Sequence, residues 1–154
     1  MNPARTDVDQ LVKQVVSEFE PQLREGAELT LEIEPGVLEC DREGMTQILR
    51  NFLANALKYS RSSTPPRIRI EGHANTDGYR FSVNDNGVGF DMRYHDRIFE
   101  IFHRLTNEGD QGGTGVGLAL AARAAERMGG RVWAESAPGR GATFFLELNS
   151  RTHA

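Results

Sequence analysis

The sequence has little of several residue types, and each shortage excludes a class of protein. Among 154 residues there is a single cysteine, Cys40, so neither an internal disulfide nor a multi-cysteine metal site can form. Lys and Arg number 18 against 22 Asp and Glu, which gives no electrostatic reason to expect nucleic acid or an anionic membrane as a partner. The low cysteine content favours a reducing compartment, and we expect the cytoplasm.

Long hydrophobic runs are also missing. The most apolar stretch, residues 116–125, contains Arg123 and is far shorter than the ~20 residues that a membrane span needs. Residues 1–7 have no apolar signal core, so secretion is not indicated. A content of 38% hydrophobic and 26% charged residues instead predicts one soluble domain over residues 1–154, with its core from about 7 to 148. A membrane anchor outside this chain stays open.

Hydrophobic periodicity predicts three helices and five strands. A 3.6-residue period predicts helices over 7–25, from an N-cap at Asp41 to about Tyr59, and over 118–128, with glycines closing the last one. Alternation between turn residues predicts strands over 28–34, 67–71, 79–83, 132–135 and 142–148, the second and third forming a hairpin. Between 84 and 114 glycines interrupt any period, and we expect a long, partly mobile loop.

A polar stripe follows the apolar stripe of the second helix. Asn51, Asn55 and Lys58 lie at i, i+4 and i+7, which places two amides and an ammonium on one helix face. An amide oxygen can ligate Mg²⁺, and a lysine can neutralise a phosphate. Taken alone, a solvated polar face explains this triplet more simply.

One carboxylate and two glycines directly follow the strand 79–83. Asp85 can accept a hydrogen bond from an amino group such as that of adenine when it is ionised. Gly87 and Gly89 permit close backbone approach. An ordinary turn of the Asp/Asn-Gly type is the alternative.

A glycine-rich segment, residues 112–118, leads straight into the third helix. Exposed backbone N–H groups and the positive end of a helix dipole form a natural anion cradle. The segment is not a P-loop, because no Gly-Lys-Ser/Thr follows, and no strand precedes it as in a dinucleotide fingerprint. Phosphate is its natural ligand, and a flexible loop is the alternative.

These segments occur together in a characteristic order. Residues 51–59, 85–89, 98–104 and 113–118 resemble the N, G1, F and G2 boxes of sensor histidine kinases, and 139–144 resembles their final glycine-rich segment. The resemblance covers about Asp7 to Leu148. It implies the Bergerat-type fold shared with gyrase, heat-shock chaperones and mismatch-repair ATPases. That fold is an α/β two-layer sandwich in which a mixed, mainly antiparallel sheet packs on three helices, with an ATP lid.

The resemblance also implies which residues bind Mg-ATP. Asn55 would ligate Mg²⁺. The residues that act in phosphoryl transfer would be Arg104, Asn51 and Lys58, with Arg104 approaching the γ-phosphate. The nucleoside and its base would meet Tyr59, Asp85, Gly87, Gly89 and Thr143. The triphosphate would be cradled by Gly113, Thr114, Gly115, Gly117 and Leu118.

The implied function is donation of the γ-phosphoryl group to a histidine on a separate helical hairpin, and indirectly to a response regulator. A self-contained ATPase is an alternative, but the chaperone, gyrase and mismatch-repair relatives have a glutamate where this chain has Asn51, whose amide is a very poor base. A binding module without transfer is a third alternative, against which Asn55, Asp85 and Arg104 argue.

The four histidines show neither metal-ligand spacing nor the acidic Ser-His-Glu-Leu/Ile context of the family's phosphoacceptor. We therefore expect the phosphoacceptor and dimerisation domain to lie outside this chain. Without it, we expect a monomer that does not itself contact a membrane. Phe99 and Phe102 are expected in packing, and Trp133 in the core.

Overall fold

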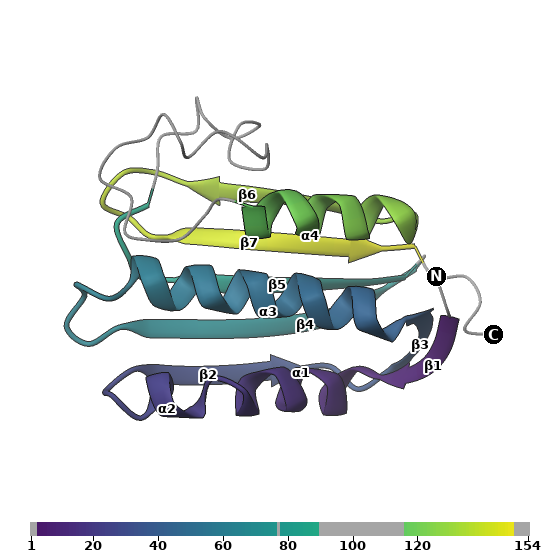
Figure 1. The fold of residues 1–154 in the computed structure, drawn as a ribbon, viewed down its shortest axis with the longest axis horizontal. Coiled ribbons are helices and arrows are strands. Elements are labelled where there is room, and N and C mark those ends of the chain that lie inside the picture. The colour runs from purple at the N-terminus through teal and green to yellow at the C-terminus, as the bar shows by residue number, and fades with distance from the viewer. Residues whose placement is uncertain (1–2, 77, 90–115, 150–154) are drawn as a thin grey trace.

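The computed structural model describes residues 3–76, 78–89 and 116–149. It contains one layer of helices and one layer of strands, and the helices all lie on the same face of the larger sheet (Figure 1). The elements follow the order β1 (Pro3–Asp7), α1 (Val8–Ser17), α2 (Glu20–Leu23), β2 (Glu28–Ile33), β3 (Val37–Asp41), α3 (Arg42–Tyr59), β4 (Arg67–Asn75), β5 (Gly78–Asp85), α4 (Val116–Arg127), β6 (Arg131–Ser136) and β7 (Ala142–Leu148).

The larger sheet has five strands in the order β2-β4-β5-β7-β6. The β2–β4 pair is parallel, whereas the β4–β5, β5–β7 and β6–β7 pairs are antiparallel. The predicted hairpin is confirmed, with its ladder running from Ile68 opposite Asp85 to Asn75 opposite Gly78. The two-layer sandwich with a mixed, mainly antiparallel sheet is therefore the fold of this chain.

The first predicted helix is interrupted. The side chain of Asp7 caps α1 by accepting from the Gln10 amide at 3.1 Å, and α1 ends at Ser17. A separate turn, α2, follows with Pro21 near its start. Proline has no N–H to donate to the Ser17 carbonyl, so it cannot continue the helix. The prediction of one helix over 7–25 was wrong for this reason.

The long helix α3 lies between α1 and α4 in the helix layer and packs on the sheet (Figure 1). It begins after Asp41 as predicted, although the Asp41 side chain makes no capping hydrogen bond. Its buried stripe consists of Gly44, Met45, Ile48, Leu49, Phe52, Leu53 and Ala56. The last helix, α4, is closed by Gly129 at a φ of +75° and by the Gly130 amide, which donates to the Ala125 carbonyl at 2.8 Å. This is the glycine C-cap that the sequence predicts.

Two short strands were not predicted. β1 and β3 pair antiparallel in a sheet of their own, from Pro3 opposite Asp41 to Asp7 opposite Val37. Buried Thr6, rather than an apolar residue, faces inward from β1. The segment therefore lacks the alternating hydrophobic pattern by which strands are recognised.

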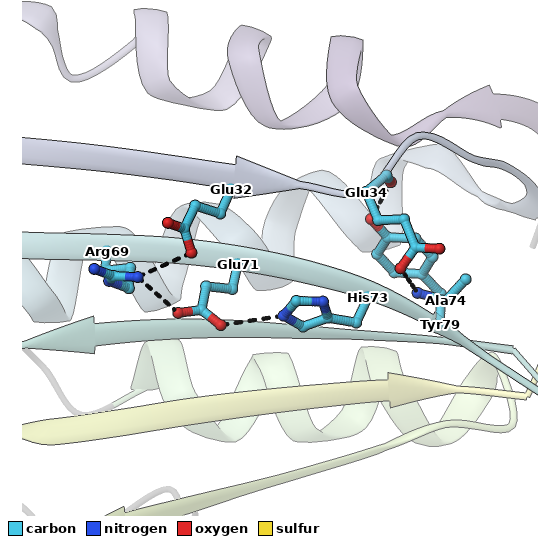
Figure 2. A network of polar contacts seen from close by, with 7 residues as sticks. All are labelled: Glu32, Glu34, Arg69, Glu71, His73, Ala74 and Tyr79. Carbon is cyan, nitrogen blue, oxygen red and sulfur yellow. Dashed lines mark hydrogen bonds and ion pairs between the residues drawn. The ribbon is translucent and has the colours of Figure 1, made fainter.

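The face of the five-stranded sheet away from the helices carries ion pairs over β2 and β4 and an aromatic pair over β6 and β7. Arg69 lies between Glu32 and Glu71, and Glu71 also contacts His73 (Figure 2). Trp133 belongs to this open face, where it stacks on Phe145 with ring centroids 4.9 Å apart. The prediction that Trp133 lies in the core was wrong. Successive side chains of a strand point to opposite faces, and the buried Ala134 faces the helices, so Trp133 faces away from them.

Candidate functional site

The C-terminal end of β5 holds a buried carboxylate. Tyr79, Phe81, Val83 and Asp85 alternate along β5 on the helix-covered face, and only 2% of Asp85 is exposed. Its Oδ1 accepts a hydrogen bond from the Gly87 amide at 2.8 Å. Its Oδ2 is buried, and within the described ranges it has no hydrogen-bond partner. An unsatisfied buried acceptor is unfavourable by about 1–3 kcal/mol, so Oδ2 is a strong candidate for contact with a ligand.

The surroundings of Asp85 shift its protonation. Burial raises the pKa of this carboxyl to about 6, while the nearby backbone N–H groups of Gly87 and Ala142 act in the opposite direction. Desolvation penalises the charged form, which is the reason for the increase. Above this pH the side chain is an ionised acceptor whose second oxygen is available to a donor.

Glycine at position 87 lets α3 approach β5. A Cβ on Gly87 would overlap the carbonyl oxygen of Tyr59, the last residue of α3, and would lie 2.8 Å from Asp85 Oδ1. The next amide, that of Val88, donates to the same Tyr59 carbonyl at 3.2 Å. The end of α3 and the end of β5 are therefore in direct backbone contact beside Asp85.

Two further glycines bring the β6–β7 turn to the same place. Gly89 has a φ of +68° and Gly141 a φ of +77°. A Cβ at Gly89 would overlap the Ala137 carbonyl, and one at Gly141 would overlap the Asp85 carbonyl. Side chains rarely adopt these φ values, so both positions require glycine. The sequence singled out Gly89 but assigned Gly141 no role.

The predicted polar stripe of α3 is present and half-buried. The Asn55 amide nitrogen donates to the Asn51 carbonyl at 2.8 Å. This orientation commits the nitrogen as the donor and leaves the amide oxygen, Oδ1, as the group able to ligate a cation. The Lys58 ammonium lies 5.0 Å from the centroid of the Tyr59 ring, within cation–π range.

The stripe fits Mg²⁺ held together with phosphates rather than Mg²⁺ in a protein cage. The described residues contain no group of three or more His, Cys, Asp or Glu side chains able to hold a metal ion. Mg²⁺ in nucleotide sites is usually bound through one or two protein oxygens plus phosphate oxygens and water. Asn55 Oδ1 matches the protein contribution in such a site.

The structure does not bring every predicted residue to Asp85. Thr143 lies on the open face of the sheet, where its hydroxyl accepts from Asn84 at 2.8 Å. Its neighbour Ala142 is paired with Asp85 and points to the helix-covered face. Thr143 therefore cannot make the predicted contact on the face that Asp85 occupies.

The remaining predicted residues belong to the glycine-rich segment and the F box. The Leu118 side chain is buried in the hydrophobic core, so only its backbone is left to contact a phosphate. Gly117 is the second residue of α4. The other predicted positions lie outside the described residues: Arg104, Gly113, Thr114 and Gly115, together with Phe99 and Phe102 and the predicted lid.

Two elements end at this site. α3 and β5 finish at the same end of the molecule, on the left in Figure 1, and α4 begins nearer the middle of that view, with its N-terminal end directed toward the same side. The N-terminal end of α4 carries the positive pole of its dipole, which favours an anion. This side of the sandwich therefore combines a buried acceptor, an amide oxygen able to ligate a cation and a helix N-terminus that favours an anion.

Sequence reasoning missed two residues at this end. Asn86, which stands between Asp85 and Gly87 in the sequence, makes hydrogen bonds to Ser63, Pro65 and Arg67. Ser60 is fully buried directly after Tyr59, and its hydroxyl oxygen has no hydrogen-bond partner in the part of the chain that the structure describes. A serine after a helix gives no local signal of burial, because the burial arises from distant segments.

Comparison with known proteins identifies the family of this chain. The family model described as histidine kinase-, DNA gyrase B-, and HSP90-like ATPase matches residues 40–152. Phytochrome-like protein Cph1 of Synechocystis is 35% identical over 144 residues, which are 93% of this chain and 19% of that protein. Sensor histidine kinase AruS of Pseudomonas aeruginosa is 38% identical over 150 residues, 90% of this chain and 15% of that protein.

A solved structure, that of full-length ShkA in complex with AMPPNP, has a TM-score of 0.84 at 30% identity and covers 100% of this chain and 32% of ShkA. The chain thus spans less than a fifth of the two curated relatives, 19% and 15% of their lengths. No helix among the described residues is long and apolar enough to cross a membrane.

Proposed function

We propose that this chain, which belongs to the histidine kinase-, DNA gyrase B-, and HSP90-like ATPase family, binds Mg-ATP and presents the γ-phosphoryl group to a histidine on a separate domain. The observation that carries the proposal is Asp85, whose Oδ2 is buried without a partner in the described structure. Ionised Asp85 accepts a hydrogen bond from the exocyclic amino group of adenine. Guanine has a carbonyl oxygen at that position and cannot donate there.

The helix face of α3 would hold the metal and phosphates. Asn55 Oδ1 would be the protein ligand of Mg²⁺, and Lys58 and Asn51 would contact phosphate oxygens. Bound Mg²⁺ would neutralise phosphate charge and align the phosphate groups. Tyr59 would lie beside the nucleoside, with Gly87 and Gly89 leaving room for the base.

The glycine-rich segment would complete the triphosphate site. Gly113, Thr114, Gly115 and Gly117 would offer backbone amides at the start of α4, where the helix dipole favours an anion. Arg104 would neutralise charge that develops as the γ-phosphoryl group leaves. These assignments rest on motif position.

Transfer, rather than hydrolysis, is favoured by what α3 provides. Asn51 occupies the place where the hydrolytic relatives have a glutamate, and an amide cannot activate water as a general base. The acceptor would be a neutral histidine nitrogen of a dimerising helical hairpin, from which a response regulator receives the group. Positioning supplies most of the catalysis in phosphoryl transfer, so the chain without that hairpin should be nearly inert.

A labelling experiment tests this function. The chain is mixed with γ-labelled ATP and Mg²⁺, alone and with the cognate phosphoacceptor hairpin. We expect little hydrolysis alone and acid-labile label on a hairpin histidine when the hairpin is added. Asn55→Ala should remove most of the Mg²⁺-dependent ATP affinity and most of the label. Asn84→Ala, on the open face of the sheet, serves as the control.

Two outcomes would contradict the proposal. Brisk ATP turnover by the isolated chain would point to the self-contained ATPase. Label on one of this chain's own histidines would place the acceptor inside the domain.

A further inference from the structure

Asn86 lies between the two residues that shape the base site, yet its side chain does not belong to it. The residue is exposed, whereas Asp85 before it and Gly87 after it are buried. Asn86 uses its backbone and its side chain to bind the segment that connects α3 to β4, residues 60–66, and Arg67 at the start of β4. We refer to this segment as the α3–β4 connection.

Four hydrogen bonds join Asn86 to this part of the chain. Its side-chain Oδ1 accepts from the Arg67 amide at 2.8 Å, and its Nδ2 donates to the Pro65 carbonyl at 3.0 Å. Its backbone amide donates to the Arg67 carbonyl at 3.2 Å. Its backbone carbonyl accepts from the Ser63 hydroxyl at 2.7 Å. Both ends of the side-chain amide are therefore engaged.

The α3–β4 connection is in turn attached to the end of α3. The Ser63 amide donates to the Ser60 carbonyl at 2.9 Å, and the Ser60 amide donates to the Ala56 carbonyl at 3.1 Å. Across the site, the Val88 amide donates to the Tyr59 carbonyl at 3.2 Å. Residues 85–88 are thus held to the end of α3 by two routes, one through Val88 and one through Asn86.

We infer that Asn86 is a positioning residue that fixes the carboxylate of Asp85 relative to α3, and so sets the selectivity of the site for adenine. The inference rests on the proposed function, since it concerns how that site recognises its base. With the side-chain amide removed, the hydrogen bonds to the Arg67 amide and the Pro65 carbonyl are lost. Residues 85–88 keep the Val88 route, the strand ladder and the two backbone hydrogen bonds of Asn86, and are held less tightly. Asp85 Oδ2 then gains freedom to turn toward water and loses its preference for one donor position.

A merely structural role would give a different result. Exposed hydrogen bonds contribute modestly to stability, because water replaces the lost partner. If Asn86 only stabilised the loop, its removal would lower the affinities for ATP and GTP equally. The ratio of the two affinities separates the two roles, because it depends on where the Asp85 carboxylate stands.

The same strand offers a matched control. Asn84 is an exposed asparagine on β5 whose Nδ2 donates to Thr143 Oγ1 at 2.8 Å and to the Ala142 carbonyl at 3.3 Å. Asn84→Ala and Asn86→Ala each remove two side-chain hydrogen bonds next to Asp85. The bonds of Asn84 lie on the open face and do not reach the α3–β4 connection.

The test measures ATP and GTP affinities of the chain in the presence of Mg²⁺ for the wild type, Asn86→Ala, Asn84→Ala and Ser63→Ala. We expect Asn86→Ala to lower the ATP preference about tenfold, Ser63→Ala to lower it less, and Asn84→Ala to leave it unchanged. Far-ultraviolet circular dichroism confirms that each variant is folded. A wild-type ratio in Asn86→Ala, or an equal loss in Asn84→Ala, overturns the inference.

Two further outcomes are distinguishable. If the wild type itself does not prefer ATP, the proposed base recognition fails rather than the role of Asn86. If Asn86→Ala does not fold, Asn86→Asp replaces it, because this variant keeps an acceptor for the Arg67 amide and loses the donor to Pro65. A reduced ratio in Asn86→Asp supports the inference, and an unchanged ratio overturns it.

Discussion

The open face of the five-stranded sheet places its carboxylates beside arginines, whereas the helix-covered face buries Asp85 without a described partner for Oδ2. Glu71 lies 3.3 Å from Arg69, and Glu147 lies 3.1 Å from Arg80 and 2.9 Å from Arg131 (the Glu71 contact is drawn in Figure 2). The pKa of Glu71 is lowered chiefly by its hydrogen bond with His73, and the pKa of Glu147 chiefly by its hydrogen bond with Arg131. Burial raises the pKa of Asp85 to about 6.

The ionised carboxylates of the open face stabilise the folded chain, whereas the ionised carboxylate of Asp85 destabilises it. Carboxylates on the open face are ionised beside a cation and remain near solvent. Asp85 is desolvated, and its ionised form is therefore unfavourable for folding. A sheet that pairs its acidic groups on one face and leaves one unsatisfied on the other indicates that the unsatisfied group serves a ligand.

We expect the largest loss of stability and of ATP binding from a substitution at Gly141, where the β6–β7 turn contacts the backbone of Asp85. Gly141 and Gly139 both have a φ of +77°, but a Cβ at Gly141 would overlap the Asp85 carbonyl, whereas nothing lies within 4 Å of one at Gly139. Backbone strain at this φ alone costs about 1–3 kcal/mol. Because Gly141→Ala adds the overlap with the Asp85 carbonyl, it should lower the free energy of unfolding by more than this and abolish ATP binding.

Gly139→Ala is the matched control, because it meets only the unfavourable φ. It should lower the free energy of unfolding by about 1 kcal/mol and keep ATP binding. Thermal or urea unfolding and nucleotide titration measure both quantities. Equal effects of the two substitutions would show that close approach at Asp85 does not shape the site.

A smaller effect follows from the pKa of Asp85 and has opposite signs for folding and binding. The folded-state pKa of about 6 exceeds the ordinary value of 3.8, so the folded chain takes up a proton first as the pH falls. From this group alone, the free energy of unfolding should rise by about 1 kcal/mol between roughly pH 7 and pH 5. ATP affinity should fall about tenfold over the same range, because the protonated acid no longer serves as the ionised acceptor.

The open-face carboxylates do not interfere in this window. The pKa values of Glu71 and Glu147 lie below the ordinary 4.5, so their stabilising effect is present above that pH and is lost only as the pH falls further. The phosphates of ATP also titrate in this range. The pH dependence of ATP affinity in Asp85→Asn reports the contribution of the nucleotide alone. Parallel pH profiles of wild type and Asp85→Asn would contradict the assignment.

The smallest effect belongs to the open face. Glu147 contacts Arg80, Arg131 and Asn75, yet the two arginines are well exposed. Glu147→Gln should lower the free energy of unfolding by about 1 kcal/mol or less, and less still at high salt. Its ATP affinity should equal that of the wild type in nucleotide titrations. A clear loss of ATP affinity would mean that the two faces of the sheet are coupled.

Local patterns predicted the elements whose stability is local. The apolar stripe of α3, the β4–β5 hairpin and the glycine cap of α4 each have a period or a turn residue that marks them. The pairing of β1 with β3 joins residues far apart in the sequence, from Pro3 to Asp41. Leu38 and Cys40 alternate in β3, but β1 has no such pattern, and the partner strand supplies the hydrogen bonds that define the ladder.

The site was predictable in its chemistry and less so in its geometry. The motif order predicted ligand contacts for Asp85 and Asn55. The structure gives Asp85 a buried Oδ2 without a described partner and Asn55 an amide oxygen able to ligate a cation, and their contact with a ligand stays a prediction. The burial of Asp85 depends on β7 and on the end of α3, which sequence spacing does not reveal. Thr143 shows the limit: alternation with Phe144 toward the core turns its side chain to the open face.

The most direct test of the account compares the affinities for Mg-ATP and Mg-GTP of the wild type and of Asp85→Asn, at a pH well above the pKa of about 6. An unpaired buried acceptor costs about 1–3 kcal/mol, so the wild type should prefer ATP by roughly one to two decades, and Asp85→Asn should lose most of that preference. Equal affinities of the wild-type chain for ATP and GTP would contradict the assignment of Asp85 Oδ2 to the adenine amino group.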